Sequence, residues 1–285
     1  MLSFNNLGHW GRLGNQMFQY ASLKGLADKH GYEFCIPNSE FVNSWTDHQL
    51  FEVFELRSLK NIGITRFVDG QTVFLKNRFA DNPYENNPEK VVPTVQEEVF
   101  HFNDVLFNNC PNNVDLFGYF QTEKYFKHIR DEVKRDLTFK EDILNPAKEF
   151  RDSIDGEVIS LHIRRGDYLH QPQHPVQPLE YYKKALEYFD ENIPVIVFSD
   201  DSEWVKSEEM FESDRFIVSE DNSNVIDMCL MTLCDYHIIA NSSFSWWGSW
   251  LSDSKKTITP NLWFGPPLDV QKDTKDVYCE GWVRI

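Results

Sequence analysis

The sequence predicts an α/β protein with parallel sheets. Strand-like apolar runs alternate with helix-like segments along the second half of the chain. The 285 residues suffice for two domains of ordinary size, and 41% hydrophobic with 26% charged residues is a composition typical of folded, soluble proteins. In addition, polar segments follow several apolar runs, at the positions where parallel sheets bind ligands. We expect one domain over residues 1–150 and another over residues 151–285.

A helix followed by a strand is predicted near the N-terminus. Apolar residues recur at helical spacing over residues 17–31, which indicates a helix. Its last turn carries Lys29 and His30, and Gly31 suits the position just after a helix end. Residues 32–37 then resemble a short strand.

The next part of the chain is harder to interpret. Residues 38–115 carry no readable motif, apart from a loop at residues 80–94 that is indicated by its proline and asparagine content. Residues 114–120 resemble a buried strand. A helix is predicted over residues 122–137, with Thr122 as its N-cap.

The second half of the chain is more regular. A polar stretch at residues 140–156, part of it compatible with a helix, marks the expected domain boundary. Strands are predicted at residues 157–163, 193–199, 236–240 and 256–260, and helices at residues 179–189, 223–234 and 244–252. This alternation implies a parallel sheet with helices on its faces.

Charge and composition exclude several function classes. The formal net charge is −17, so nucleic acid is not an expected partner. Five cysteines without a C-x-x-C pair favour neither a disulfide framework nor a zinc site. No apolar stretch approaches the ~20 residues of a membrane span, and no secretory signal is visible, so we expect a cytoplasmic protein.

Four polar segments stand where a parallel sheet would bind a ligand. They contain Arg164, Arg165 and Asp167; Asp200 and Asp201; Asn241, Ser242, Ser243 and Phe244; and, in the N-terminal "GRLGNQ", Gly14, Asn15 and Gln16. Adjacent arginines suit bidentate contacts to phosphate, and a serine-rich turn that opens a helix suits an anion. The aspartate pair could accept hydrogen bonds from guanine or bind a divalent metal. Together the segments suggest a guanine nucleotide.

Each segment also has a structural interpretation. The arginine pair could form ion pairs, and Asp201 or Ser202 could cap a helix. The tryptophans of residues 244–252 suit a buried core. His170 and His174 are four residues apart, but neighbouring prolines argue against a helical metal pair. No metal site is therefore predicted.

Five motifs together resemble the α-1,2-fucosyltransferase family, in particular its bacterial-type members. They are "GRLGNQMFQYA", "GYFQTEKYF", "HIRRGDY", "VFSDD" and "IIANSSFSWWGSWL". The resemblance implies a GT-B fold, in which two Rossmann-like domains face each other across a cleft. Residues 1–150 would then be the acceptor-side domain and residues 151–285 the GDP-fucose-binding domain. The implied reaction is an inverting transfer from GDP-β-L-fucose to a galactose 2-hydroxyl, with no cofactor and no essential metal.

The resemblance also assigns roles to residues. Arg164 and Arg165 would hold the pyrophosphate, and Asp167 would be either the catalytic base or an orienting partner of an arginine. The donor-binding set comprises Gly14, Asn15, Gln16, His162, Arg164, Arg165, Asp200, Asp201, Asn241, Ser242, Ser243 and Phe244. Within it, His162 and the aspartate pair would face the guanosine, the serine turn would bind phosphate oxygens, and Asn15 would lie near the transferred sugar.

Alternative functions stay open at this point. "HIRR" is shared with α-1,6- and protein O-fucosyltransferases, and Arg12 stands where bacterial-type members usually carry glycine. A fucosyltransferase of another linkage, or a non-catalytic nucleotide- or glycan-binding relative, therefore remains an alternative. The expected acceptor is a galactose-terminated oligosaccharide or a lipid-linked glycan. We expect no integral membrane segment, and a peripheral association with a membrane stays open.

Overall fold

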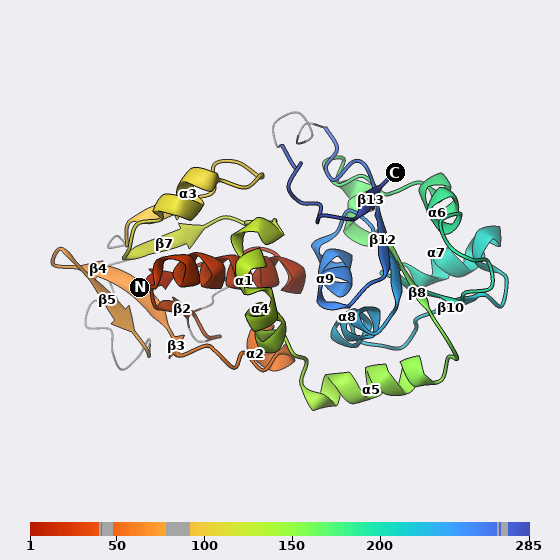
Figure 1. The fold of residues 1–285 in the computed structure, drawn as a ribbon, viewed down its shortest axis with the longest axis horizontal. Helices are drawn as coiled ribbons and strands as arrows, with labels where there is room; N and C mark the ends of the chain where they lie inside the picture. The colour runs from red at the N-terminus through yellow and green to blue at the C-terminus, as the bar shows by residue number, and fades with distance from the viewer. Residues whose placement is uncertain (40, 42–47, 78–91, 267, 269–272) are drawn as a thin grey trace. The chain divides into compact units, whose positions relative to one another are not determined.

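The computed structural model describes residues 1–39, 41, 48–77, 92–266, 268 and 273–285. These residues form two compact units, each with its own parallel sheet (Figure 1). The first unit consists of Met1–Thr138 with Lys275–Val277, and the second of Phe139–Thr274 with Tyr278–Ile285. The predicted α/β class is confirmed.

The first unit is built on five parallel strands. Their order in the sheet is β3 (Asn61–Ile62), β2 (Phe34–Ile36), β1 (Leu2–Ser3), β7 (Val114–Phe117) and β6 (Thr94–Gln96). Most of these strands span only two or three residues, too few for a period-two pattern to show in the sequence. The predicted strand at 114–120 ends early because Gly118 takes a positive φ of 151°.

Shorter elements also lie within residues 38–115, the part of the chain in which the sequence showed no motif. A hairpin joins β4 (Ile64–Val68) to β5 (Gln71–Leu75) through Asp69 and Gly70, both at positive φ, as a two-residue turn of this kind requires. The short helices are α2 (Leu50–Val53) and α3 (Asp104–Asn109). Residues 80–91 of the predicted loop lie outside the described residues.

Helix α1 (Leu13–His30) confirms the first predicted helix and begins four residues before it. Gly31 ends the helix in the left-handed conformation, at φ 66°, and its N–H bonds to the carbonyl of Asp28. The helix is buried on nearly all sides. A Cβ at Gly25 would lie 2.1 Å from the carbonyl oxygen of Tyr125, so only glycine allows the following segment to pack this closely.

That following segment corrects the prediction of one helix over residues 122–137. Two 3₁₀ turns, Glu123–Tyr125 and Lys127–Ile129, precede the helix α4 (Arg130–Asp136). Phe126, at φ −134°, interrupts the helical backbone. The physical reason is tertiary, because buried Tyr125 and Phe126 pack against α1. Thr122 does cap the first turn, since its hydroxyl accepts from the N–H of Lys124 at 3.3 Å.

A buried ion pair ties α1 to the end of α4. Lys24 Nζ lies 2.6 Å from Asp136 Oδ2, and both side chains are buried. The same carboxylate accepts from Tyr20 Oη at 2.6 Å and from the N–H of Ser58 at 2.8 Å. Burial alone would raise the pKa of Asp136, but hydrogen bonds from Lys24, Ser58 and Tyr20 outweigh it and lower the pKa.

The second unit contains a six-stranded parallel sheet. Its strand order is β10 (Phe216–Val218), β9 (Val195–Ser199), β8 (Ile159–Ile163), β11 (Tyr236–Ile238), β12 (Lys256–Thr259) and β13 (Val283–Arg284). β8 lies between β9 and β11 and is buried along its length. The strands and helices predicted after residue 156 are confirmed within a few residues. The strands β10 and β13 were not predicted, and the helix α7 (Ser202–Ser207) was anticipated only by the interpretation of Asp201 or Ser202 as a helix cap.

Three longer helices of the second unit follow the prediction closely: α6 (Leu179–Leu186), α8 (Asn224–Thr232) and α9 (Ser243–Leu251). The side chains of Trp246, Trp247 and Trp250 on α9 are at most 1% exposed. Their rings pack on one another at 4.9–6.1 Å. The interpretation of these tryptophans as core is confirmed.

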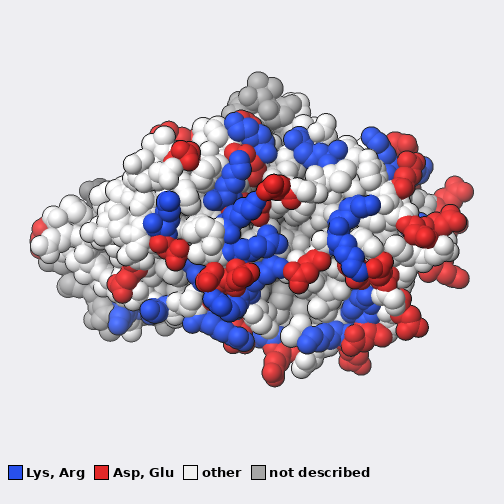
Figure 2. Space-filling view, viewed as in Figure 1, with Lys and Arg blue, Asp and Glu red and all other residues white. Residues whose placement is uncertain are grey.

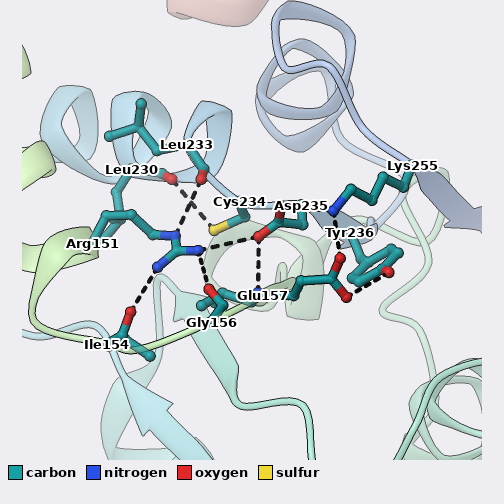
Figure 3. A network of polar contacts seen from close by, with 11 residues as sticks. Arg151, Ile154, Gly156, Glu157, Leu230, Leu233, Cys234, Asp235, Tyr236 and Lys255 are labelled. Carbon is teal, nitrogen blue, oxygen red and sulfur yellow. Dashed lines mark hydrogen bonds and ion pairs between the residues drawn. The ribbon is translucent and has the colours of Figure 1, made fainter.

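Helix α5 (Glu141–Asp152) occupies the polar stretch expected at the domain boundary. It packs on α8, so the units change over at residues 138/139, earlier than the 150/151 division expected from the sequence. Arg151 fixes its end by donating to the carbonyls of Ile154, Gly156 and Leu233 and to the carboxylate of Asp235 (Figure 3). These hydrogen bonds of a charged guanidinium tie the end of α5 to the rest of the second unit.

Surface charge agrees with the acidic composition. On the face drawn in Figure 2, side chains of both signs are interspersed, and carboxylates prevail over the end of the second unit that carries α7. All five cysteines are buried, and none of them is in a disulfide bond. Within the described ranges, no helix combines the length and the apolar character needed to span a bilayer.

Candidate active site

Arg164 and Arg165 directly follow β8, whose neighbours in the sheet are β9 and β11. All three strands are parallel, so their carboxyl ends meet at one edge. Asp200 follows β9 at the same edge, and the turn at Asn241 follows β11 after two residues. The structure therefore brings together three of the four predicted segments within the second unit.

The Arg164 guanidinium is held by two carboxylates. Its Nη1 lies 2.9 Å from Asp200 Oδ2, and its Nη2 lies 2.6 Å from Asp167 Oδ1. The guanidinium also lies 5.3 Å from the ring centre of Tyr168. Asp167 thus makes the ion pair with Arg164 that an orienting role requires. This role was one of the two expected for Asp167, and the other was that of catalytic base.

Arg165 is oriented differently and keeps donors unused. Its Nε lies 3.0 Å from Asp201 Oδ2, and its guanidinium lies 3.8 Å from the ring centre of Trp204. Within the part of the chain that the structure describes, its two Nη nitrogens make no hydrogen bond or ion pair. The side chain is 17% exposed, and its planar fork remains available to an anion.

The aspartate pair holds the arginines in place. Asp200 Oδ1 accepts from the N–H of Arg165 at 2.8 Å, in addition to the Arg164 contact. Asp201 caps α7, where its Oδ1 accepts from the N–H of Trp204 at 3.3 Å. Both structural interpretations, ion pairing of the arginines and helix capping, are confirmed as contacts. The carboxylates that we expected to face guanosine are engaged with protein groups.

Gly166 leaves room for the Asp200 carboxylate that holds Arg164, and replacing Gly166 tests this contact. A Cβ at Gly166 would lie 2.3 Å from Asp200 Oδ2, so Gly166→Ala must displace the carboxylate that holds Arg164. A charge-assisted hydrogen bond contributes about 1.5–3 kcal/mol, so kcat/KM should fall at least ~10-fold in steady-state assays. In an Asp200→Ala background the same substitution should have almost no further effect. Additive losses would contradict this mechanism.

The serine turn lies beside the arginine turn. Ser242 is the N-cap of α9, and its Oγ accepts from the N–H of Phe244 at 3.3 Å. Tyr168 joins the two turns, because its hydroxyl donates to the carbonyl of Asn241 at 3.1 Å while its ring faces Arg164. Burial raises the pKa of Tyr168 to about 12, so this hydroxyl stays protonated and able to donate.

Two residues of the predicted donor set have contacts that indicate a scaffolding role. The Asn241 side chain is buried, accepts from Gln177 Nε2 at 3.0 Å and donates to the carbonyl of Trp263 at 3.0 Å. His162 is 4% exposed, and its Nδ1 lies 2.8 Å from Ser245 Oγ, which fixes α9 to β8. Burial and, to a lesser extent, Arg164 lower the pKa of His162 to about 3, so the ring is neutral.

The N-terminal motif lies in the first unit. Gly14 is buried in the first turn of α1. Gln16 accepts from the N–H of Gln49 at 3.0 Å, which anchors the helix start. Asn15 Oδ1 accepts from Gln121 Nε2 at 2.8 Å. Arg12 is exposed and makes no side-chain cap.

The described residues show no group of three or more His, Cys, Asp or Glu side chains positioned to hold a metal. His174 stacks on Tyr168 with ring centres 5.0 Å apart, and His170 is exposed.

Three residues of the site were not predicted from the sequence: Tyr168, Trp204 and Gly166. Tyr168 and Gly166 stand inside "HIRRGDY", and the motif was the only signal that could have found them.

Comparison with known proteins identifies the family. The sequence pattern of glycosyl transferase family 11 matches residues 3–285. The chain belongs to glycosyl transferase family 11. The predicted resemblance is confirmed, and this family 11 protein is a glycosyltransferase.

Its relatives include bacterial and mammalian proteins. An α-1,2-colitosyltransferase from Escherichia coli is 33% identical over 96% of both chains. The O-antigen biosynthesis glycosyltransferase WbnK from Escherichia coli is 31% identical over 89% of this chain and 93% of that one. Galactoside α-(1,2)-fucosyltransferase 2 of Hylobates lar is 24% identical over 85% of this chain and 67% of that one.

Solved structures agree on the fold. The fucosyltransferase NodZ from Bradyrhizobium resembles this family 11 chain with a TM-score of 0.51, at 15% identity over 88% of this chain and 93% of that one. NodZ α-1,6-fucosyltransferase soaked with GDP-fucose gives a TM-score of 0.50, at 15% identity over 88% and 92%. The GT-B fold class is thereby confirmed.

Proposed function

We propose that this family 11 enzyme transfers L-fucose from GDP-β-L-fucose to the 2-hydroxyl of a galactose residue, with inversion at the anomeric carbon. The observation that carries the proposal is the pair of guanidinium groups held by Asp200 and Asp201 at the carboxyl end of β8, beside the start of α9. A diphosphate is the part of a nucleotide sugar that suits this site.

The donor diphosphate would be bound from two sides. The Nη groups of Arg165 form a planar fork whose plane is fixed by stacking on Trp204 and by the bond to Asp201. The start of α9, with Ser242, Ser243 and the Phe244 amide, offers hydroxyls and the positive end of a helix dipole. Arg164 adds positive charge while its carboxylate partners keep it in place.

The same groups would assist the reaction. The acceptor oxygen bonds to the anomeric carbon as the bond from that carbon to the β-phosphate oxygen breaks, and the proton of the acceptor hydroxyl passes to the departing GDP or to solvent water. Negative charge therefore grows on the departing GDP. Arginines positioned in advance stabilise that charge more in the transition state than in the ground state, which lowers the barrier. Asp167 contributes by orienting Arg164, the role that its contact supports.

A donor with a related sugar is the second candidate. It is favoured by the α-1,2-colitosyltransferase, which is 33% identical over nearly the whole chain. Colitose is fucose without the 3-hydroxyl. A site that hydrogen-bonds this hydroxyl would reject the deoxy sugar by up to ~10⁴-fold, whereas an apolar site would discriminate weakly. The two donors compared at equal concentration therefore distinguish the candidates.

The acceptor that we propose is a galactose-terminated oligosaccharide or lipid-linked glycan. The experiment is GDP release by the purified chain from GDP-fucose and GDP-colitose, with a panel of β-galactosides and with the product linkage determined by NMR. Release that depends on the acceptor, with an α-linkage to the galactose 2-hydroxyl, is expected. GDP binding without release would favour the non-catalytic alternative, and another linkage would favour the α-1,6 or protein O-linked alternative.

We also propose that the enzyme needs no metal or other cofactor, because the arginines supply the positive charge that a divalent ion would supply next to a diphosphate. Excess EDTA should leave the rate of GDP release unchanged within about twofold, and added Mg²⁺ or Mn²⁺ should raise it by no more than about twofold. Loss of most of the activity in EDTA, with recovery on adding one of these ions, would contradict metal independence. A cytoplasmic location stays a prediction.

A further inference from the structure

Among the tryptophans that the structure describes, Trp10 has the most exposed side chain. It is 54% exposed, whereas Trp263 and the three tryptophans of α9 are at most 3% exposed. Tryptophan combines a large apolar area with a polar N–H, so an accessible indole can contribute strongly to binding. Single exposed apolar residues are common, however, so the surroundings of Trp10 decide what it can do.

The indole lies at the edge of the first unit's sheet where ligands are expected. Trp10 belongs to the loop that leads from the carboxyl end of β1 to α1. Its ring packs edge-to-face on Phe117, the last residue of β7, with ring centres 5.2 Å apart. β1 and β7 are parallel neighbours, so Trp10 spans the carboxyl ends of two adjacent strands.

Two glycines fix the loop on either side of this region. Gly8 and Gly11 have φ values of 86° and 85°, which other residues rarely adopt. A Cβ at Gly8 would lie 2.7 Å from the His48 ring, and one at Gly11 would lie 2.4 Å from Asn15 Nδ2. The loop therefore packs tightly on the side chains beneath it and holds Trp10 without burying it.

Neutral hydrogen-bonding groups lie next to the loop. Asn15, which touches Gly11, accepts from Gln121 through its side-chain oxygen. Among the described residues, the Asn15 amide N–H and the Gln121 carbonyl oxygen have no further partner. One donor and one acceptor next to a loop that carries an exposed aromatic ring match a sugar ring, which has C–H groups on one face and hydroxyls at its rim.

We infer that Trp10 is the platform on which the galactose ring of the acceptor stacks, with the Asn15–Gln121 pair bonding its hydroxyls. The inference rests on the proposed function and names an acceptor subsite for it. β-Galactosides present three C–H bonds on the ring face opposite the axial 4-hydroxyl, and this face suits an indole. Trp10 would determine acceptor affinity and leave the donor site untouched.

The first test separates acceptor from donor. Trp10→Ala should raise the KM for lactose, or for the best galactoside of the panel, about tenfold, equivalent to the loss of about 1.4 kcal/mol of stacking. Its affinity for GDP, measured by calorimetry, should not change. Trp10→Phe should restore most of the acceptor affinity. Val105→Ala, at an apolar residue that is 72% exposed on α3, is the matched control and should change neither quantity.

A second measurement does not need turnover. NMR saturation transfer from the protein to lactose or to another galactose-terminated oligosaccharide should be strong for the wild type and largely lost in Trp10→Ala. Equal transfer in both proteins, or none in the wild type, would overturn the inference. If transfer is lost in the variant while the wild type releases no GDP with any acceptor, the subsite stands and the proposed function fails.

Discussion

Arg165→Ala should lower kcat by at least ~10²-fold, the scale of losing one preorganised stabiliser of transition-state charge. Within the described residues the Arg165 Nη groups make no hydrogen bond or ion pair, and the guanidinium lies over Trp204 with 17% of the side chain exposed. Arg165→Lys should restore little, because a point charge cannot replace a planar fork. Steady-state kinetics with GDP-fucose and the best galactoside measure the effect.

Controls distinguish this loss from a structural effect. Arg135→Ala removes an exposed arginine that pairs only with Glu132 among the described residues, and it should leave kcat unchanged. Asp201→Asn keeps the cap of α7 but removes the charge that orients Arg165, so its loss should be smaller than that of Arg165→Ala. A folded Arg165→Ala enzyme with near-normal kcat would rule out the catalytic role.

Asp136→Ala should lower the free energy of unfolding by about 3–5 kcal/mol, because it leaves the buried Lys24 ammonium without its carboxylate. It also removes the acceptor of Tyr20 and Ser58, whose hydrogen bonds to the charged carboxylate help to lower the pKa of Asp136. Chemical denaturation at neutral pH, with the m-value compared between proteins, measures the change.

Two further variants serve as controls for this stability prediction. Asp131→Ala removes an exposed carboxylate from the first turn of α4 and should change stability very little. Lys24→Met combined with Asp136→Leu replaces the ion pair by apolar side chains and should recover a large part of the loss. If Asp136→Ala is no less stable than Asp131→Ala, the buried pair does not hold α1 and α4 together.

The sequence predicted the second unit much better than the first. The strands β8 and β9 are five-residue apolar runs between polar turns, so local pattern and tertiary role agree. In the first unit, strands of two or three residues depend on pairing between distant segments, as Leu2 pairs with both Phe34 and Val114. Such pairing leaves no local periodicity, and the helix expected at residues 122–137 was broken by packing against α1.

The candidate site was predicted in its position but only partly in its contacts. Parallel strands alone imply that Arg164, Asp200 and the turn at Asn241 share one edge, and the structure confirms it. The partners within that edge depend on side-chain geometry that spacing does not encode. Asp200 and Asp201 contact arginines, and His162 bonds to Ser245 of α9. That the three side chains face guanosine stays a prediction.

GDP and GMP binding by the wild-type enzyme and Arg165→Ala is the most direct measurement of whether the arginine fork recognises a diphosphate. In calorimetric titrations, the wild type should prefer GDP by about 10- to 100-fold, equivalent to one charge-assisted contact to the second phosphate. Arg165→Ala should bind both nucleotides with nearly equal affinity. An Arg165→Ala enzyme that keeps the full preference for GDP would show that the diphosphate is bound elsewhere.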